Sequence, residues 1–154
     1  METKVKNKQK KNRMSKFGPV EKASEPITFK YGIPGFEHLS KFIFQDLVNY
    51  PPFQIFRSLE EDDLSMIVLN AKYLKDLEGL KIPNNELQQI NADSQKNIDM
   101  YVILRVKAEN KQFVANTRAP LIVNKSNNLG NQIVIEKEGL LTDYPIQVAG
   151  QSDE

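Results

Sequence analysis

Short apolar segments of β-strand length, separated by turn residues, are the feature that most constrains this fold. Residues 27–31, 41–47 and 53–59 alternate apolar and other side chains, and residues 64–71 hold a short continuous apolar run. A period of two is typical of one face of a strand, and a continuous run fits a strand buried on both faces. Strands that follow one another this closely predict an antiparallel meander rather than alternating strands and helices.

The strand pattern returns in the second half of the chain. Residues 98–110 predict a long strand whose more apolar side carries Met100, Val102, Leu104 and Val106. Further strands are expected at 111–117, 119–124 and 131–137, and the asparagines and glycine of "KSNNLG" suit a hairpin loop before the last of them.

Between the two sets of strands the pattern changes to a helical one. Leu74, Leu77 and Leu80 stand at helical spacing, and Asn84 or Asn85 could cap a second short helix. We therefore expect a mainly β protein, a small antiparallel β-barrel-like single domain with one or two short helices. An open sandwich is the alternative architecture.

Charge is distributed unevenly along the 154 residues. Residues 1–16 carry seven basic side chains and one acidic one, which leaves 14 basic and 19 acidic residues for the rest. The sequence thus predicts three parts: a basic, disordered N-terminal extension at 1–24, a β domain at 25–148, and a short tail at 149–154. A body with a net charge of −5 disfavours direct binding of nucleic acid, which needs clustered cations.

The residues and motifs that several classes of protein function require are missing from this sequence. There is no cysteine, and no apolar run approaches the roughly 20 residues that span a bilayer. The motifs of nucleotide loops and of serine nucleophiles are missing, and His38 is the only histidine. We expect no enzyme activity, no cofactor, no metal and no membrane contact, and a protein that is cytoplasmic and monomeric on its own.

The segment "YGIPGFE" predicts a rigid turn directly after the first strand. Gly32 and Gly35 can take positive φ, and Pro34 fixes its own φ. Ile33 and Phe36 could fold back onto the core or form an apolar anchor at a protein interface, flanked by Glu37.

The densest acidic cluster, "EEDD", comprises Glu60, Glu61, Asp62 and Asp63 and lies between two expected strands. It lacks the spacing and the glycine of a calcium loop, so a solvated hairpin tip is expected. Such a loop could also dock a basic protein partner.

Taken together, "ITFKYGIPGFE", "PPFQIFRSL", "NTRAPLIVN" and "GNQIVI" resemble the FliW family of flagellar assembly factors in composition, order and spacing. The resemblance covers roughly residues 27–146 and is most specific in the G-I-P-G-F-E and A-P-L-I-V-N segments. Thr117 departs from it, because the family often has leucine at this place.

This resemblance implies a small barrel-like protein that is not an enzyme. Its expected partners are CsrA, a basic dimer that represses translation of flagellin mRNA, and flagellin itself, which would compete with CsrA in a homeostatic circuit. The expected partner-binding residues lie in the turn, the acidic loop and the N-T-R-A-P segment: Ile33, Phe36, Glu37, Glu60, Glu61, Asp62, Asp63, Asn116 and Arg118. An OB-like nucleic-acid-binding barrel that uses the basic N-terminal arm is the alternative.

Overall fold

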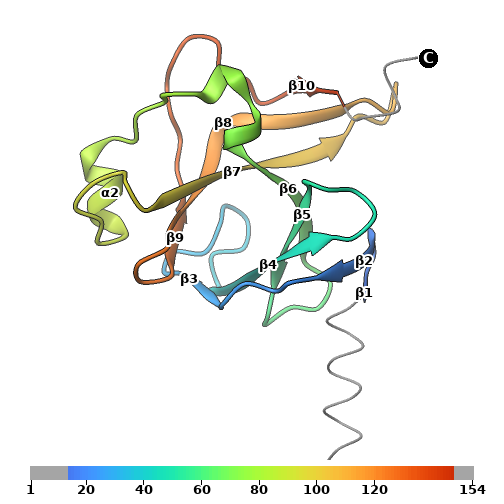
Figure 1. Ribbon diagram of the computed structural model, residues 1–154, viewed down its shortest axis with the longest axis horizontal. Coiled ribbons are helices and arrows are strands. Elements are labelled where there is room, and N and C mark those ends of the chain that lie inside the picture. The colour runs from blue at the N-terminus through green and yellow to red at the C-terminus, as the bar shows by residue number, and fades with distance from the viewer. Residues whose placement is uncertain (1–13, 148–154) are drawn as a thin grey trace, which may run out of the picture.

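The computed structural model describes residues 14–147, so the predicted tail at 149–154 and most of the predicted extension lie outside it. Strands dominate the described part of the chain (Figure 1). The first five are β1 (Met14–Ser15), β2 (Gly18–Glu21), β3 (Ile27–Phe29), β4 (Lys41–Leu47) and β5 (Gln54–Ser58). The others are β6 (Ser65–Asn70), β7 (Ile98–Val106), β8 (Phe113–Asn124), β9 (Leu129–Gln132) and β10 (Tyr144–Ile146).

Seven of the described strands close into a barrel. They follow the order β4-β3-β9-β8-β7-β6-β5, and β5 pairs with β4 to complete the ring. From β3 to β7, each strand pairs antiparallel with the next strand along the chain, as expected for a meander. The contact between β3 and β9 is parallel, because in a ring of seven strands joined by antiparallel pairs the first and last strands run in the same direction. The predicted barrel-like fold is confirmed.

Aromatic side chains fill the interior of the barrel. Phe42 and Phe56 stack with ring centroids 4.5 Å apart, and Phe29 meets both rings edge-on at 5.3 Å. Phe44 stacks on Tyr101 at 4.3 Å. These rings come from four strands, so their packing holds opposite walls of the barrel together.

A second apolar cluster lies outside the barrel, on the outer face of β6 to β9. The more apolar side of β7 faces it, with Val102 and Leu104 buried. The segment between β6 and β7 covers this face with two 3-10 helices, η1 (Ala71–Tyr73) and η2 (Lys75–Leu77), and with α2 (Asn84–Gln89). Pro83 precedes α2 and gives no side-chain cap, so the predicted asparagine cap is wrong.

Strand β8 corrects one prediction of the sequence. The sequence predicts two strands, at 111–117 and 119–124. In the structure, Phe113–Asn124 form a single strand with an irregularity near its middle. Between Ile103↔Asn116 and Tyr101↔Leu121 the register shifts, because four residues of β8 lie opposite a single residue of β7. A bulge of this kind bends a strand without ending it.

The sequence predicts that the β domain starts at residue 25, but the sheet begins earlier in the chain. Strand β2 pairs with β4 through Val20↔Leu47, and Val20 is 3% exposed. It packs with Leu47 and Ile55 in a small apolar cluster. Residues 14–21 are therefore part of the sheet, and the prediction of a disordered extension up to residue 24 is wrong for them.

Candidate functional site

The G-I-P-G-F-E segment closes on itself as a tight turn. The Phe36 amide donates a hydrogen bond to the Ile33 carbonyl at 2.8 Å, and the two residues form an isolated bridge. Pro34 and Gly35 hold the two central positions, with Gly35 at a φ of +89° as the second of them requires. The predicted rigid bend is present.

The turn packs on the barrel rather than standing clear of it. Ile33 is 2% exposed and belongs to the interior cluster, while Phe36 is half-buried against the same cluster. Of the two alternatives open for Ile33, the structure shows the core. Phe36 packs against the core and keeps part of its ring at the surface.

Glu37 is held by its own turn. Its carboxylate accepts a hydrogen bond from the Gly35 amide at 3.1 Å. This bond, together with the Glu37 backbone amide and the nearby His38, holds the pKa of the Glu37 carboxyl below its usual value. The charge therefore stays at the surface next to Phe36 down to more acidic pH.

In the acidic loop, Glu60 has a structural role that the sequence did not reveal. Its Oε1 accepts hydrogen bonds from the Ser40 and Lys41 amides at 2.7 and 2.8 Å. These bonds, led by the one from Lys41, lower the pKa of the Glu60 carboxyl. Ser58, fully buried, fixes the start of the loop by accepting bonds from the Glu60 and Glu61 amides. Glu60 is exposed, as predicted for a solvated tip, but its carboxylate also holds the loop to the backbone of Ser40 and Lys41.

The other three acids of the loop lie at the surface. Glu61, Asp62 and Asp63 are exposed, and Asp62 and Asp63 border a groove of about 320 Å³. The remaining walls come from β1 and its turn and from β5 and β6, through Met14, Ser15, Lys16, Arg57 and Ser65.

The structure brings the turn and the acidic loop together. Glu60 accepts bonds from the amides of Ser40 and Lys41, three and four residues after the turn, and His38 helps to lower the pKa of both Glu37 and Glu60. Two segments more than 20 residues apart in sequence thus form one end of the barrel surface.

Asn116 and Arg118 lie in β8, where their bonds hold the irregular part of the strand. The Asn116 Oδ1 accepts a hydrogen bond from the Ala119 amide at 3.1 Å, and the Arg118 carbonyl accepts one from Ile135 at 2.8 Å. Between them, Thr117 is buried and its hydroxyl both donates to and accepts from the backbone of Leu141. The Arg118 side chain remains exposed.

A family model for the FliW protein matches residues 11–146, which include every strand from β1 to β10. The chain belongs to the FliW family.

Named relatives agree with the family model. The chain is 33% identical over 124 residues to the flagellar assembly factor FliW of Clostridium botulinum, a match that covers 80% of this chain and 84% of the relative. It is 31% identical over 135 residues to the flagellar assembly factor FliW of Thermotoga maritima, covering 86% and 88%. A crystal structure of the flagellar assembly factor FliW superposes with a TM-score of 0.71 at 25% identity, covering 88% of this chain and 97% of the other.

This FliW chain also has an aromatic groove that sequence reasoning missed. It encloses about 630 Å³ and is lined by prolines and tyrosines of three segments, among them Tyr50, Pro51, Pro52, Tyr73, Tyr144 and Pro145. Tyr50 and Tyr73 are more than half exposed. Adjacent prolines after Tyr50 were the only local signal, because Tyr73 and Tyr144 reach the groove through the tertiary fold.

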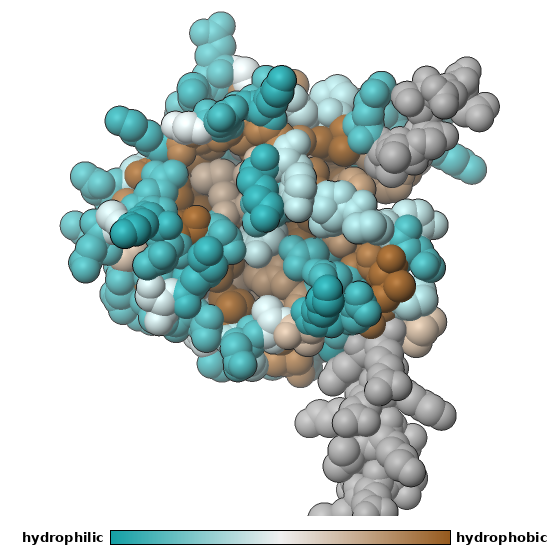
Figure 2. Space-filling view, viewed as in Figure 1, coloured by the Kyte–Doolittle hydropathy of each residue, from teal (hydrophilic) through white to brown (hydrophobic). Residues whose placement is uncertain are grey.

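Two features are not found among the described residues of the FliW chain, a cluster of metal ligands and a membrane-spanning helix. Within residues 14–147 no group of three or more acidic or histidine side chains could hold a metal ion. None of the helices described there is long and apolar enough to cross a membrane. On the face seen in Figure 2, hydrophilic side chains surround smaller hydrophobic areas.

Proposed function

We propose that this FliW chain binds a CsrA-like translational regulator and thereby relieves repression of flagellin mRNA, and that it also binds flagellin. The family match over residues 11–146 carries the proposal. Competition between the two partners would couple flagellin synthesis to flagellar assembly. The chain acts by binding and without catalysis, in the cytoplasm and as a monomer before it meets a partner.

The acidic loop suits contact with the regulator. A protein that binds RNA must present positive charge, and Glu61, Asp62 and Asp63 offer three exposed carboxylates on one loop. Phe36 and Glu37 lie in the neighbouring turn and extend this surface with an apolar and an acidic group. Arg118, which is exposed at the bend in β8, is a further proposed contact.

We propose that three of the expected contact residues do not touch the partner directly. Ile33 has almost no surface to offer a partner, and the Glu60 carboxylate is engaged by two backbone amides. The side-chain oxygen of Asn116 is likewise bonded within its own strand. We propose that these three residues support the binding surface from within the domain.

Binding kinetics test the proposal. The full chain is immobilised, and the regulator and flagellin from the same organism are passed over it at salt concentrations up to 0.5 M, where the Debye length is about 4–5 Å. We expect both proteins to bind and to displace each other. We also expect the triple variant Glu61→Gln, Asp62→Asn and Asp63→Asn to slow association with the regulator more than with flagellin.

A matched control changes two exposed acids elsewhere, Glu136→Gln and Glu138→Gln, and should leave association with the regulator unchanged. If neither protein bound the intact chain, the proposed function would be wrong. If both bound but the triple variant and salt had no effect, the acidic loop would be excluded and Phe36 would become the next residue to test.

A further inference from the structure

The aromatic groove offers a partner three tyrosines from ordered segments. Tyr50 opens a turn that the Phe53 amide closes by donating to the Tyr50 carbonyl at 2.9 Å. Tyr73 lies in the 3-10 helix η1, and the Tyr144 hydroxyl donates a hydrogen bond to Asp76. Aromatic side chains that are accessible but already ordered lose little conformational entropy when a partner packs on them.

Prolines complete the surface of the aromatic groove. Pro51, Pro52 and Pro145 line it, and all three are exposed. A proline has no backbone N–H, so these residues give no donor to a strand that would pair beside them. The groove therefore favours contacts between rings over the addition of a β-strand.

The aromatic groove continues into a polar cavity of about 570 Å³. The two share Tyr73, Phe53 and both prolines of the turn as lining residues. Asp46 and Asp99 line the polar cavity, and both are half-buried. A ligand that follows the groove thus passes from an aromatic half to a half with carboxylates.

The two half-buried carboxylates make the interior of the polar cavity negative. Asp46 Oδ1 accepts a hydrogen bond from the uncharged Gln54 side chain at 2.9 Å, and Asp99 Oδ1 lies 3.5 Å from the Lys125 ammonium. Tyr101 lines the same cavity. Burial, followed by the charges of Asp99 and Asp46, raises the pKa of Tyr101 to about 12, so both carboxylates act on this interior.

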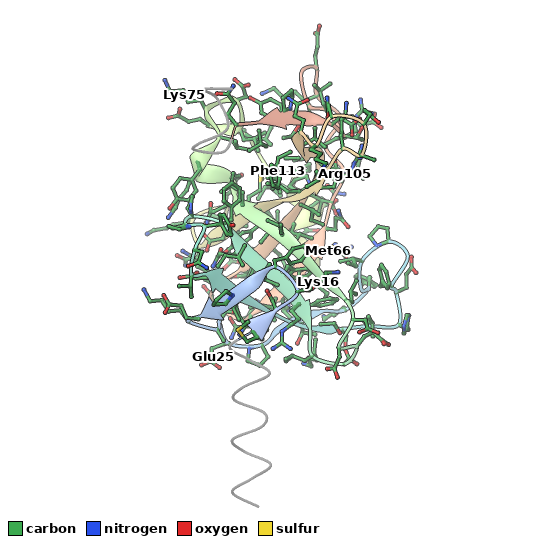
Figure 3. All side chains as sticks on the ribbon, turned by 90° about the vertical axis from the view of Figure 1, so that its right-hand side faces the viewer. Lys16, Glu25, Met66, Lys75, Arg105 and Phe113 are labelled. Atoms are coloured by element: carbon green, nitrogen blue, oxygen red, sulfur yellow. The ribbon has the colours of Figure 1, made fainter. Side chains whose placement is uncertain are left out.

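The cations of this surface lie at its outside. Lys22 and Lys72 in the lining of the polar cavity are exposed, and the Lys72 Nζ lies 5.3 Å from the centroid of the Tyr73 ring. Figure 3 shows Lys75, the charged residue that lines the aromatic groove, at the outer edge of the molecule. With Glu21, the cavity has three carboxylates against two ammonium groups, and exposed charges are screened more than half-buried ones. Charge complementarity therefore favours a cationic group inside the cavity.

We propose that the aromatic groove and the polar cavity bind a proline-rich segment of a partner protein, with a basic residue of that segment placed at Asp46 and Asp99. Proline rings pack on aromatic side chains, and a polyproline II chain needs no backbone ladder. Such a chain is already extended before it binds, so ordering it costs little. Single-stranded RNA also stacks on aromatic rings, but the two carboxylates would repel its phosphates.

This site is separate from the acidic loop. The aromatic groove and the polar cavity are lined by different residues from the groove at Asp62 and Asp63. The inference therefore does not rest on the proposed function, and it holds whether or not the regulator or flagellin carries a proline-rich segment.

Titration of the full chain with two synthetic peptides tests the proposal. One peptide is decaproline, and the other is decaproline with one arginine added at each end. In amide NMR spectra we expect both to shift the signals of Tyr50, Phe53 and Tyr73. The peptide with arginines should bind about threefold more tightly, as one weak ion pair would give.

A double variant tests the aromatic half. Tyr50→Ala with Tyr73→Ala should weaken binding of both peptides at least about fivefold, because two aromatic contacts are lost. Both side chains are more than half exposed, so the fold should persist, which urea unfolding checks. Tyr31→Ala is the matched control, since Tyr31 is 60% exposed and lies outside the lining of the groove, and it should leave the affinity unchanged.

A second variant tests the polar cavity. Asp46→Asn keeps an oxygen that can accept from Gln54 but removes the charge. It should abolish the advantage of the peptide with arginines and leave the binding of decaproline unchanged.

The proposal would be overturned if neither peptide shifted the three signals, if the double variant bound as tightly as the Tyr31 variant, or if the arginines gave no gain in affinity. Oligouridine of ten nucleotides that bound the groove more tightly than either peptide would assign the site to nucleic acid instead. Peptide binding by a chain that bound neither the regulator nor flagellin would support this inference and contradict the proposed function alone.

Discussion

At the scale of single residues, Gly32 is the position where the backbone leaves no room for a side chain. Its φ is +64°, and an added Cβ would lie 2.5 Å from the Phe36 carbonyl oxygen and 2.7 Å from the Glu37 Cα. Gly35 also has a positive φ, but a Cβ there would meet nothing within 4 Å. Gly32 is therefore required both by its positive φ and by the lack of space for a Cβ, whereas Gly35 is required by its positive φ alone.

This difference gives a paired prediction. Gly32→Ala should lower the free energy of unfolding by at least about 2 kcal/mol, because strain adds to a clash with backbone atoms that cannot move aside. Gly35→Ala should cost about 1 kcal/mol from strain alone. Urea unfolding of both variants checks this, and equal losses would show that the close approach at Gly32 is relieved by a shift of the turn.

Glu60 provides a prediction about pH. Its pKa is lowered in the folded protein, so its contribution to stability is present above the unfolded value of 4.5 and is lost as the pH falls through the lower folded value. Glu60→Gln should therefore destabilise the protein at pH 7, and the difference from the unmodified chain should shrink below about pH 4.5.

Unfolding of Glu60→Gln is compared with that of Glu61→Gln across this pH range. The Glu61 amide donates to the Ser58 hydroxyl, whereas the Glu61 side chain is exposed, so we expect its replacement to be nearly neutral. A Glu60 variant as stable as the Glu61 variant at pH 7 would mean that the two amide bonds contribute nothing net.

At the scale of elements, β2 shows how a segment of low apolar content joins the sheet. Only Val20 is buried in its four residues, but the strand extends β4 through Val20↔Leu47 and Glu21↔Asp46. The Val48 amide adds a bond to the Pro19 carbonyl at 3.0 Å. One buried side chain and a few backbone bonds are enough because the neighbouring strand is already ordered by the barrel.

We predict that Val20→Ala lowers the free energy of unfolding by about 1.5 kcal/mol, the value of roughly two buried methyl groups. Val48→Ala, at a side chain that is 43% exposed, should cost less than about 0.5 kcal/mol. Deleting residues 1–22 should destabilise at least as much as Val20→Ala, and thermal or urea unfolding that shows no loss would contradict the role of β2.

At the scale of the whole molecule, the barrel and its outer cover form two apolar clusters that share the strands β6 to β8 as a common wall. The interior cluster holds the four buried phenylalanines, and the outer one holds mainly aliphatic side chains, including those of η2, α2 and the segment before β10. Tyr101 belongs to the interior cluster, where it lies among the walls of the barrel. Burial, followed by the charges of Asp99 and Asp46, raises the pKa of Tyr101 to about 12.

A spectrophotometric titration should therefore show one tyrosine that ionises near pH 12 in the folded protein, and Tyr101→Phe should remove that step. Because the folded pKa is raised, the contribution of Tyr101 to stability is complete below pH 10 and declines between pH 10 and 12. If the unmodified protein shows no step near pH 12, the surroundings of Tyr101 are more open to water than its packing indicates, and a late step that survives in Tyr101→Phe would belong to another tyrosine.

The sequence alone determined the features that depend on neighbouring residues. Alternation gave β4 its bounds at 41–47, and the glycines and proline gave the turn at 32–37. The hairpin loop before β9 also followed from its asparagines, one of which, Asn128, takes a positive φ of 57°. In each case the torsions and side-chain directions of a few consecutive residues contain the information.

Only the tertiary structure decided which groups meet across long separations. Alternation shows that β7 has two different faces, but it cannot show that Val102 faces the outer cover while Tyr101 faces the barrel. The same holds for Glu60, whose partners lie 19 and 20 residues away, and for β2, whose burial depends on β4. A local pattern sets the direction of each side chain relative to its own strand, whereas the partner that it meets is set by how the closed barrel brings distant strands together.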